Sequence, residues 1–259
     1  MSVITSRDSK TFKELQRLTQ KKYRDREGLF IAEGPNVVDE ALGQESIEVV
    51  RVFAREGSGF EDHTEDTVIL SDKLFDSIAD TVTSQGVIAV IRKPDRGSAA
   101  GVLKSMAEAG RNVIVLDRLQ DPGNIGTIIR TAEGAGIGAA IFIKGTCDPF
   151  SPKVVRACAG SILRLPVVFA DSAEDLIGSA HDNCYSLAVT DVRNGVPYYS
   201  AGLSGDRKAL VIGNEGNGVS DTFLDEADIL VNIPMQGRLE SLNASVAAAL
   251  LMYEMARPE

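Results

Sequence analysis

The stretch that decides the fold is Asn112-Val113-Ile114-Val115-Leu116, followed by Asp117-Arg118-Leu119-Gln120-Asp121-Pro122-Gly123-Asn124-Ile125-Gly126. Its first residues form an apolar run, which is typical of a strand that is buried on both faces of a parallel sheet. Pro122 and Gly123 then favour a turn, and a helical pattern follows. Strands are expected again at 140–143, 167–169, 185–189, 209–212 and 229–233. This alternation of strands and helices predicts an α/β fold with a mostly parallel sheet, ending in a helix from about Ser241 to Met255.

The N-terminal third predicts a separate, smaller α/β unit. A first helix, with Phe12, Leu15 and Leu18 on one face, is expected to run to Gly28. Short strands are expected at 29–32, 47–53, 68–70 and 86–91, with helices after Pro35 and after Ser71. We therefore predict a small domain at residues 1–92, a linker that includes a helix at 93–110, and a larger domain at 111–259.

The composition indicates a soluble protein and argues against several classes. The chain has 259 residues, three cysteines and two histidines. The scattered cysteines match neither a disulfide framework nor a zinc site, and we expect no metal. The longest weakly polar stretch, Asn243 to Met255, is too short to span a bilayer, and no signal peptide is readable. We expect a cytoplasmic protein with no membrane partner.

Charge is distributed unevenly along the chain. The net charge is −10, yet the first 28 residues hold eight basic and four acidic side chains, a local surplus of four positive charges. A basic N-terminal segment on an acidic body is compatible with an arm that contacts nucleic-acid phosphates. A solvated helix face is the alternative explanation of the same pattern.

The loop after the first strand of the larger domain carries chemistry. Asn124 lies near the start of a helix, Gly126 permits close backbone approach, and Arg130 follows six residues after Asn124. Loop amides, a helix N-terminus and an arginine together favour a phosphate ligand. Alternatively, Asn124 caps the helix and Arg130 belongs to a surface ion pair.

Two further polar loops follow predicted strands, where open α/β sheets build their sites. The first reads Gly213-Asn214-Glu215-Gly216-Asn217-Gly218, and its three glycines predict tight turns or a close ligand. The second runs from Val231 to Ser245; Pro234 ends the strand, and Ser241 or Asn243 can cap the last helix. Ordinary turns and a helix cap would also explain both loops.

One segment matches the residues of a dinucleotide-binding fingerprint but not its expected place between a strand and a helix. Gly134-Ala135-Gly136-Ile137-Gly138-Ala139 satisfies G-x-G-x-x-A, but it follows a helical pattern and precedes a strand. The fingerprint requires the opposite order, so these glycines are interpreted as a turn after a helix.

Taken together, the three loops resemble the SpoU/TrmH family of RNA ribose methyltransferases, part of the SPOUT class. The family's N-x-G-x-x-x-R motif is similar to the segment from Asn124 to Arg130, and its G-x-E-x-x-G motif to Gly213–Gly218. Its third motif is similar to the stretch from Ile233 to Ala247. A K-x-x-R-x-x-x-G segment is matched at Lys153–Gly160. The first ninety residues resemble the family's small substrate-binding domain more loosely.

The resemblance implies an S-adenosylmethionine-dependent enzyme that methylates a ribose 2′-hydroxyl. Catalytic roles are implied for Arg130, Asn124, Glu215, Ser241 and Asn243, the last three fixing Arg130 and the substrate by hydrogen bonds. Cofactor contacts are implied for Gly213, Asn214, Gly218, Ile233, Met235 and Leu242. The RNA contacts that we expect are Arg7, Lys10, Lys13, Lys21, Lys22, Arg24, Lys153 and Arg156.

The resemblance also implies a deep trefoil knot in the larger domain and a homodimer with the last helix at its interface. The separate N-terminal module favours large-subunit (23S) ribosomal RNA over transfer RNA as the substrate. The same chemistry on transfer RNA, a dinucleotide-dependent oxidoreductase and a non-catalytic RNA-binding protein stand as the alternatives.

Overall fold

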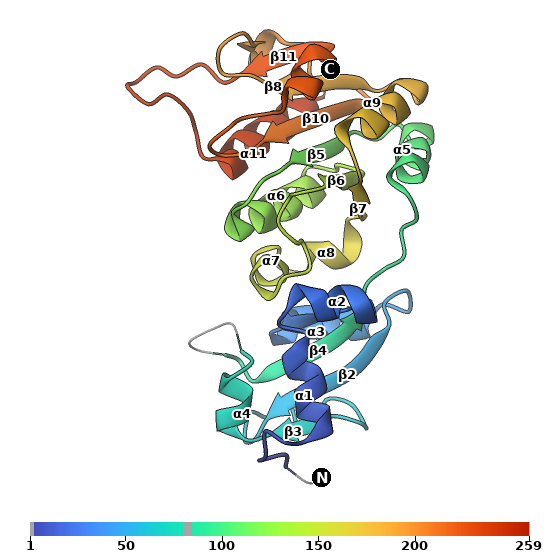
Figure 1. Ribbon diagram of the computed structural model, residues 1–259, viewed down its shortest axis with the longest axis vertical. Coiled ribbons are helices and arrows are strands. Elements are labelled where there is room, and N and C mark those ends of the chain that lie inside the picture. The colour runs from blue at the N-terminus through green and yellow to red at the C-terminus, as the bar shows by residue number, and fades with distance from the viewer. Residues whose placement is uncertain (1–2, 80–83, 259) are drawn as a thin grey trace. The chain divides into compact units, whose positions relative to one another are not determined.

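The computed structural model describes residues 3–79 and 84–258, and its contacts divide the chain into two compact units. The first unit comprises Met1–Asp95 and Asp148–Leu163, and the second comprises Arg96–Cys147 and Arg164–Glu259. Each unit contains one sheet, and Figure 1 labels most of the strands and helices.

The elements follow one another in the order that the sequence predicts. The first unit contains α1 (Lys10–Arg17), α2 (Lys21–Glu27), β1 (Leu29–Glu33), α3 (Pro35–Leu42), β2 (Val49–Arg55), β3 (Val68–Leu70), α4 (Asp72–Asp76), β4 (Val87–Arg92), α7 (Pro152–Ala157) and most of α8 (Ser161–Arg164). The second contains α5 (Ala99–Glu108), β5 (Val113–Asp117), α6 (Pro122–Gly134), β6 (Ala139–Ile143), β7 (Val167–Ala170), α9 (Ala173–Asp182), β8 (Ser186–Thr190), β9 (Val196–Pro197), a 3₁₀ turn (Tyr198–Ser200), β10 (Lys208–Gly213), α10 (Asp221–Asp225), β11 (Ile229–Asn232) and α11 (Ala244–Met255). The short strand β9 is an addition to the expected strands.

The sheet of the second unit is parallel throughout its described strands, in the order β7-β6-β5-β10-β8-β11-β9. Successive side chains of a strand point to opposite faces. Val113, Val115 and Val211 therefore join one buried cluster, to which α5, α9 and α10 also contribute. Ile114 and Leu116 fall on the other face, where α6 and α11 pack against each other. The predicted fold class is confirmed, whereas the trefoil knot stays a prediction.

The glycine-rich segment that imitates a dinucleotide fingerprint is a turn between a helix and a strand. Helix α6 ends at Gly134, Gly136 has a positive φ of 74°, and β6 starts at Ala139. The predicted interpretation of these glycines is confirmed, and this order leaves no helix N-terminus for a pyrophosphate.

The first unit has a four-stranded sheet in the order β1-β4-β2-β3, with antiparallel pairs except for β2 and β3. Phe12 and Leu15 from α1 and Phe75 from α4 are buried in a cluster with Phe53 and Ile88 from the sheet. Helix α7 packs against β1, and the ring of Phe150 lies 5.2 Å from that of Phe30. The segment Asp148–Leu163 is therefore part of the fold of this unit.

The contacts divide the chain differently from the predicted boundaries at two places. Helix α5 lies within the segment 93–110 that was expected to link the domains, but Val102 and Leu103 are buried in the core of the second unit. The segment Asp148–Leu163 joins the first unit although it lies between β6 and β7 of the second. Burial of apolar side chains, rather than chain order, determines both assignments.

The predicted first helix is wrong in one respect, because it is broken into α1 and α2 at residues 18–20. Gln20 adopts an extended conformation, and the carbonyl oxygen of Leu18 accepts a hydrogen bond of 2.8 Å from Nη1 of Arg24. Gly28, with a positive φ of 65°, ends α2 as expected.

Arg24 does not fit the prediction of a surface contact to RNA. Its side chain is only 3% exposed, and Nε and Nη2 donate to Oδ2 of Asp148 at 3.1 and 2.6 Å. Oδ1 of Asp148 accepts from the backbone N–H of Phe150. The guanidinium is therefore committed to a buried ion pair, which attaches the segment around Asp148 to α2.

We predict that Asp148→Ala lowers the free energy of unfolding by about 3–5 kcal/mol, because it leaves the Arg24 guanidinium buried without a counter-charge. Urea denaturation of the full chain measures this loss. The matched control is Asp8→Ala, which breaks the exposed Lys13–Asp8 pair and should leave the free energy of unfolding almost unchanged. Equal losses for the two variants would contradict the assigned role of the buried pair.

Candidate functional site

The candidate site lies at the carboxyl ends of β5, β10 and β11, where the three polar loops start. Open α/β sheets bind ligands at this edge. A surface cavity of about 360 Å³ lies at the opposite edge, lined by residues that include Arg111, Glu133 and Arg164. We assign the site to the carboxyl edge, since the side chains of all three motifs meet there.

Asn124 joins the three loops through its side-chain amide. Its Nδ2 donates to Oε1 of Glu215 at 3.0 Å, and its Oδ1 accepts from Nδ2 of Asn243 at 2.8 Å. The residue is buried at the first turn of α6, where Asp121 is the N-cap and accepts from the backbone N–H of Asn124. Asn124 is thus not the cap itself, and its side chain is free to link the other two motifs.

Glu215 is held as a carboxylate by neutral donors. Besides Asn124, the backbone N–H groups of Gln120 and Asp121 donate to its two oxygens at 3.3 Å. Burial raises the pKa of the Glu215 carboxyl, but these hydrogen bonds outweigh it, so the pKa lies below its ordinary value. The residue is therefore a structural anion at neutral pH, with no proton to donate.

Asn243 has two functions in the structure. It is the N-cap of α11, where its Oδ1 accepts from the backbone N–H groups of Ser245 and Val246, and its Nδ2 binds Asn124. The helix starts three residues after the predicted Ser241. Ser241 is exposed in the preceding loop and makes no hydrogen bond to another described residue.

Gly213 and Gly218 shape the loop after β10. A Cβ atom on Gly213 would lie 2.2 Å from the backbone nitrogen of Val219, so only glycine fits. Gly218 has a positive φ of 71° and exchanges two backbone hydrogen bonds with Asn214. The side chain of Asn214 binds Arg118 and the N–H groups of Gly216 and Asn217. Asn214 therefore builds the turn with its polar atoms, which leaves few of them for a cofactor.

The loop between β11 and α11 has the character of an adenosine site. Ile233, Met235 and Leu242 are partly buried, so their side chains offer apolar surface. Residues 235–242 have no regular structure, and their backbone groups make no hydrogen bonds to other described residues. Unpaired backbone groups beside apolar side chains suit an adenine ring with a polar edge, so these residues fit the implied cofactor.

Arg130 is exposed on α6 and is not joined to the network. It makes no ion pair or hydrogen bond with any residue that the structure describes. The prediction that Glu215 and Asn243 fix Arg130 by hydrogen bonds is wrong, because both bind Asn124. Six residues correspond to 600° of helix rotation, so Arg130 lies about 120° around the helix axis from Asn124.

The predicted RNA contacts other than Arg24 are exposed, and all lie in the first unit. The inclusion of Asp148–Leu163 in that unit brings Lys153 and Arg156 to the same body as Arg7 and Lys22. Lys10, Lys13 and Lys21 form exposed ion pairs, which are weak and leave these cations accessible.

Residues 3–79 and 84–258 contain no group of three His, Cys, Asp or Glu side chains that is placed to bind a metal ion.

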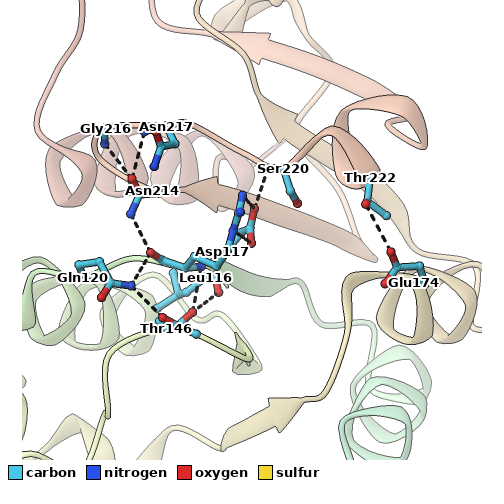
Figure 2. A network of polar contacts seen from close by, with 12 residues as sticks. Leu116, Asp117, Gln120, Thr146, Glu174, Asn214, Gly216, Asn217, Ser220 and Thr222 are labelled. Carbon is cyan, nitrogen blue, oxygen red and sulfur yellow. Dashed lines mark hydrogen bonds and ion pairs between the residues drawn. The ribbon is translucent and has the colours of Figure 1, made fainter.

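Sequence reasoning missed a second polar network beside the first, which Figure 2 shows. Asp117 is only 1% exposed, and it accepts from the backbone N–H of Ser220 at 2.7 Å and from Arg118. Thr146, in the loop after β6, binds the backbone of Leu116 and Arg118. The one available signal was an aspartate directly after an apolar strand, which alone is weak.

Comparison with known proteins agrees with this geometry. Residues 111–253 match the model of the SpoU rRNA Methylase family, and residues 9–89 match an MRM3-like substrate binding domain. The first match covers more than half of the chain. The protein belongs to the SpoU rRNA methylase family.

Similar proteins support the assignment over the whole length. The chain is 34% identical to the Bacillus subtilis 23S rRNA (guanosine(2553)-2′-O)-methyltransferase RlmP, over 98% of the chain and 99% of that protein. It is 36% identical to a Staphylococcus epidermidis putative TrmH family tRNA/rRNA methyltransferase, over 67% and 70% of the two chains. The structure of an AdoMet-bound rRNA methyltransferase from Sinorhizobium meliloti superposes with a TM-score of 0.85 at 29% identity, covering 98% and 96%. The predicted family, fold class and enzyme class are confirmed.

We predict that Glu215→Gln destabilises the protein most at neutral pH. Because the folded pKa of Glu215 is lowered, its stabilising effect is complete above the unfolded value near 4.5 and is lost as the pH falls. Urea midpoints of the wild type and the variant should therefore differ at about pH 7 and converge as the pH falls through the lowered folded pKa. A difference that stays constant over this range would contradict the charged role of the carboxyl.

Proposed function

We propose that this methylase transfers a methyl group from S-adenosylmethionine to a ribose 2′-hydroxyl of large-subunit ribosomal RNA. The observation that carries the proposal is the hydrogen-bonded set of Asn124, Glu215 and Asn243, which unites the three family motifs at one edge of the sheet. The full-length similarity to the Bacillus subtilis relative, named for this chemistry on 23S rRNA, supports the substrate. The compartment that we propose is the cytoplasm.

The cofactor would lie against the loops after β10 and β11. Backbone groups around Gly213 and Gly218 and the apolar side chains of Ile233, Met235 and Leu242 would hold it. When bound, S-adenosylmethionine supplies a methyl group on a positively charged sulfur. The protein contributes alignment of the hydroxyl with that group and exclusion of water.

Arg130 would act on the RNA. A guanidinium hardly loses its proton in proteins, so it does not serve as a base. It donates hydrogen bonds to a phosphate next to the target ribose and stabilises negative charge that develops on the 2′-oxygen, while the hydroxyl proton passes to an oxygen of that phosphate or to solvent and the sulfur leaves with its bonding electron pair. Asn124, held in one orientation by Glu215 and Asn243, fixes the first turn of the helix that carries Arg130.

Transfer RNA is the alternative substrate, since the similar Staphylococcus epidermidis protein is named for both RNA classes. The match of residues 9–89 to a substrate-binding domain favours a large, structured RNA. The exposed basic residues of the first unit would contact its phosphates, and binding should weaken steeply as salt rises.

We predict that the purified protein transfers labelled methyl groups to unmodified large-subunit ribosomal RNA and that Arg130→Ala lowers the rate by about 100-fold or more. Methyl label should be recovered on a ribose after nuclease digestion. Arg130→Lys should restore little activity, because lysine lacks the planar donor fork. Label in transfer RNA alone would establish the alternative substrate, and RNA binding without label would favour a non-catalytic RNA-binding role.

We also propose that the protein acts as a homodimer through α11. Val246, Leu250 and Tyr253 are 48%, 40% and 57% exposed and recur at helical spacing, whereas Ala248, Leu251, Met252 and Met255 of the same helix are buried. An exposed apolar row on an otherwise packed helix marks an interaction surface. A partner's RNA-binding Arg130 would then serve the adjacent cofactor loops.

We predict that Leu250→Glu converts the dimer to a monomer, as measured by analytical ultracentrifugation. The matched control is Val192→Glu, which places the same charge on an exposed apolar position outside α11 and should remain dimeric. Mixed dimers of Arg130→Ala and a cofactor-loop variant should recover part of the activity. A monomeric wild type would contradict the proposal.

A further inference from the structure

Arg118 adopts a backbone conformation that is unusual for a residue with a large side chain. Its φ is +58°, in the left-handed region that glycine or asparagine occupies more easily. Strained positions of this kind persist where the surrounding structure holds them, and they cluster at functional sites. The question is therefore what the arginine side chain contributes at a position that glycine would fill with less strain.

Three loops hold the backbone of Arg118 in place. Its N–H donates to Oγ1 of Thr146 at 3.0 Å, and its carbonyl oxygen accepts from the side-chain amides of Gln120 and Asn214 at 2.9 Å. Figure 2 labels Leu116, Gln120, Thr146 and Asn214, which come from the ends of β5, β6 and β10 and the loops after them. The conformation of Arg118 is thus over-determined by the edge of the sheet that carries the candidate site.

The side chain of Arg118 is fixed as well as its backbone. Nε and Nη2 donate to the two carboxylate oxygens of Asp117 at 3.0 and 3.3 Å. The Asp117 carboxyl is buried, whereas the Arg118 side chain is 45% exposed. One edge of the guanidinium is occupied by Asp117, and Nη1 makes no hydrogen bond to another described residue.

We propose that Arg118 binds a phosphate group of the RNA substrate with the free edge of its guanidinium. This proposal rests on the proposed function. It adds Arg118 to Arg130 as a second arginine of the second unit that contacts RNA. A guanidinium already oriented by a carboxylate loses little freedom on binding a phosphate, and its remaining N–H groups match two phosphate oxygens.

Neutralisation of Asp117 does not by itself explain this arginine. Asp117 also receives a hydrogen bond from the backbone N–H of Ser220, and its pairing with Arg118 uses only Nε and Nη2 of the guanidinium. The positive φ at position 118 also disfavours arginine relative to glycine. A phosphate of the substrate would explain three features of Arg118 together: the exposed edge of its guanidinium, the fixed orientation of its side chain and its position beside the motif loops.

Arg207 provides a matched control within the same sheet. It also has a positive φ, of 56°, and it is exposed, but it precedes β10 and so lies at the opposite edge. Substitution of either arginine by glycine removes one charge and relieves the same backbone strain. The two variants differ in which edge of the sheet loses a cation, and Arg118→Gly also leaves the buried Asp117 carboxylate without its ion pair. The comparison therefore includes Asp117→Asn/Arg118→Gly, which removes that buried charge as well.

The test is binding of the full-length protein to a fluorescent, unmodified transcript of large-subunit ribosomal RNA at several salt concentrations. Arg118→Gly should weaken binding by roughly three- to tenfold and reduce the slope of log K against log salt by about one. Arg207→Gly should leave both quantities at the wild-type values. Arg118→Lys should restore the salt slope but only part of the affinity.

Titration with S-adenosylmethionine separates the two possible sources of the anion. Its affinity should be unchanged in Arg118→Gly; a selective loss would assign Arg118 to the carboxylate of the cofactor and overturn the proposal. Wild-type RNA affinity and salt slope in Arg118→Gly, or equal losses in the two glycine variants, would overturn it as well. If Arg118→Gly does not fold, Asp117→Asn/Arg118→Gly removes the unpaired buried charge and takes its place.

The outcome for the proposed function can be read separately. A wild type that methylates RNA, together with an Arg118→Gly variant that binds RNA normally, refutes only the role of Arg118. If the wild type instead binds the transcript with a steeper salt dependence than Arg118→Gly and yet transfers no methyl group, that result refutes the proposed reaction and supports the phosphate contact.

Discussion

The amide of Asn124 is the interaction on which the site depends. Its two polar atoms connect Glu215 and Asn243, which lie 91 and 119 positions away along the chain. Glu215 also accepts from the backbone N–H of Asp121 in the loop after β5, and Asn243 accepts from that of Ser245 in α11. Since the residue is buried, loss of either hydrogen bond would leave polar atoms without water to replace it. A single side chain thus sets the mutual positions of α6, the loop after β10 and the start of α11.

The use of neutral donors around Glu215 has an electrostatic consequence. An arginine paired with this carboxylate would have part of its donor edge occupied and its charge offset. In the structure, amides stabilise the carboxylate instead, and no described residue occupies the donors of Arg130, which leaves them for an anionic ligand. Arg118 represents the intermediate case, since Asp117 takes one edge of its guanidinium and leaves the other. The two arginines therefore differ in rigidity and in free donor groups.

Much of the fold could be predicted from local pattern. The run Val113–Leu116 is buried on both faces and the later strands are also apolar, so each could be recognised in the sequence. The motif loops could be found because they follow those strands. The hydrogen bonds between these loops could not be predicted. Glu215 binds Asn124 rather than Arg130 because of how α6 is rotated about its axis, and residue types alone do not give that rotation. The left-handed backbone of Arg118 also has no local signal, because the residue type disfavours it.

The break between α1 and α2 shows most clearly why local reading fails. The pattern of apolar residues continues through Leu18, and nothing in residues 18–20 demands an interruption. The interruption is stabilised by Arg24, whose guanidinium binds the carbonyl oxygen of Leu18 and a carboxylate 124 positions further along the chain. That carboxylate, Asp148, belongs to a segment between two strands of the other unit's sheet. The chain therefore passes from one unit to the other at three places, and residues 1–95 alone would lack the carboxylate that pairs with Arg24. The first unit of this methylase is therefore complete only when it includes the segment Asp148–Leu163. That segment lies between two strands of the second unit along the chain, and it also carries Lys153 and Arg156.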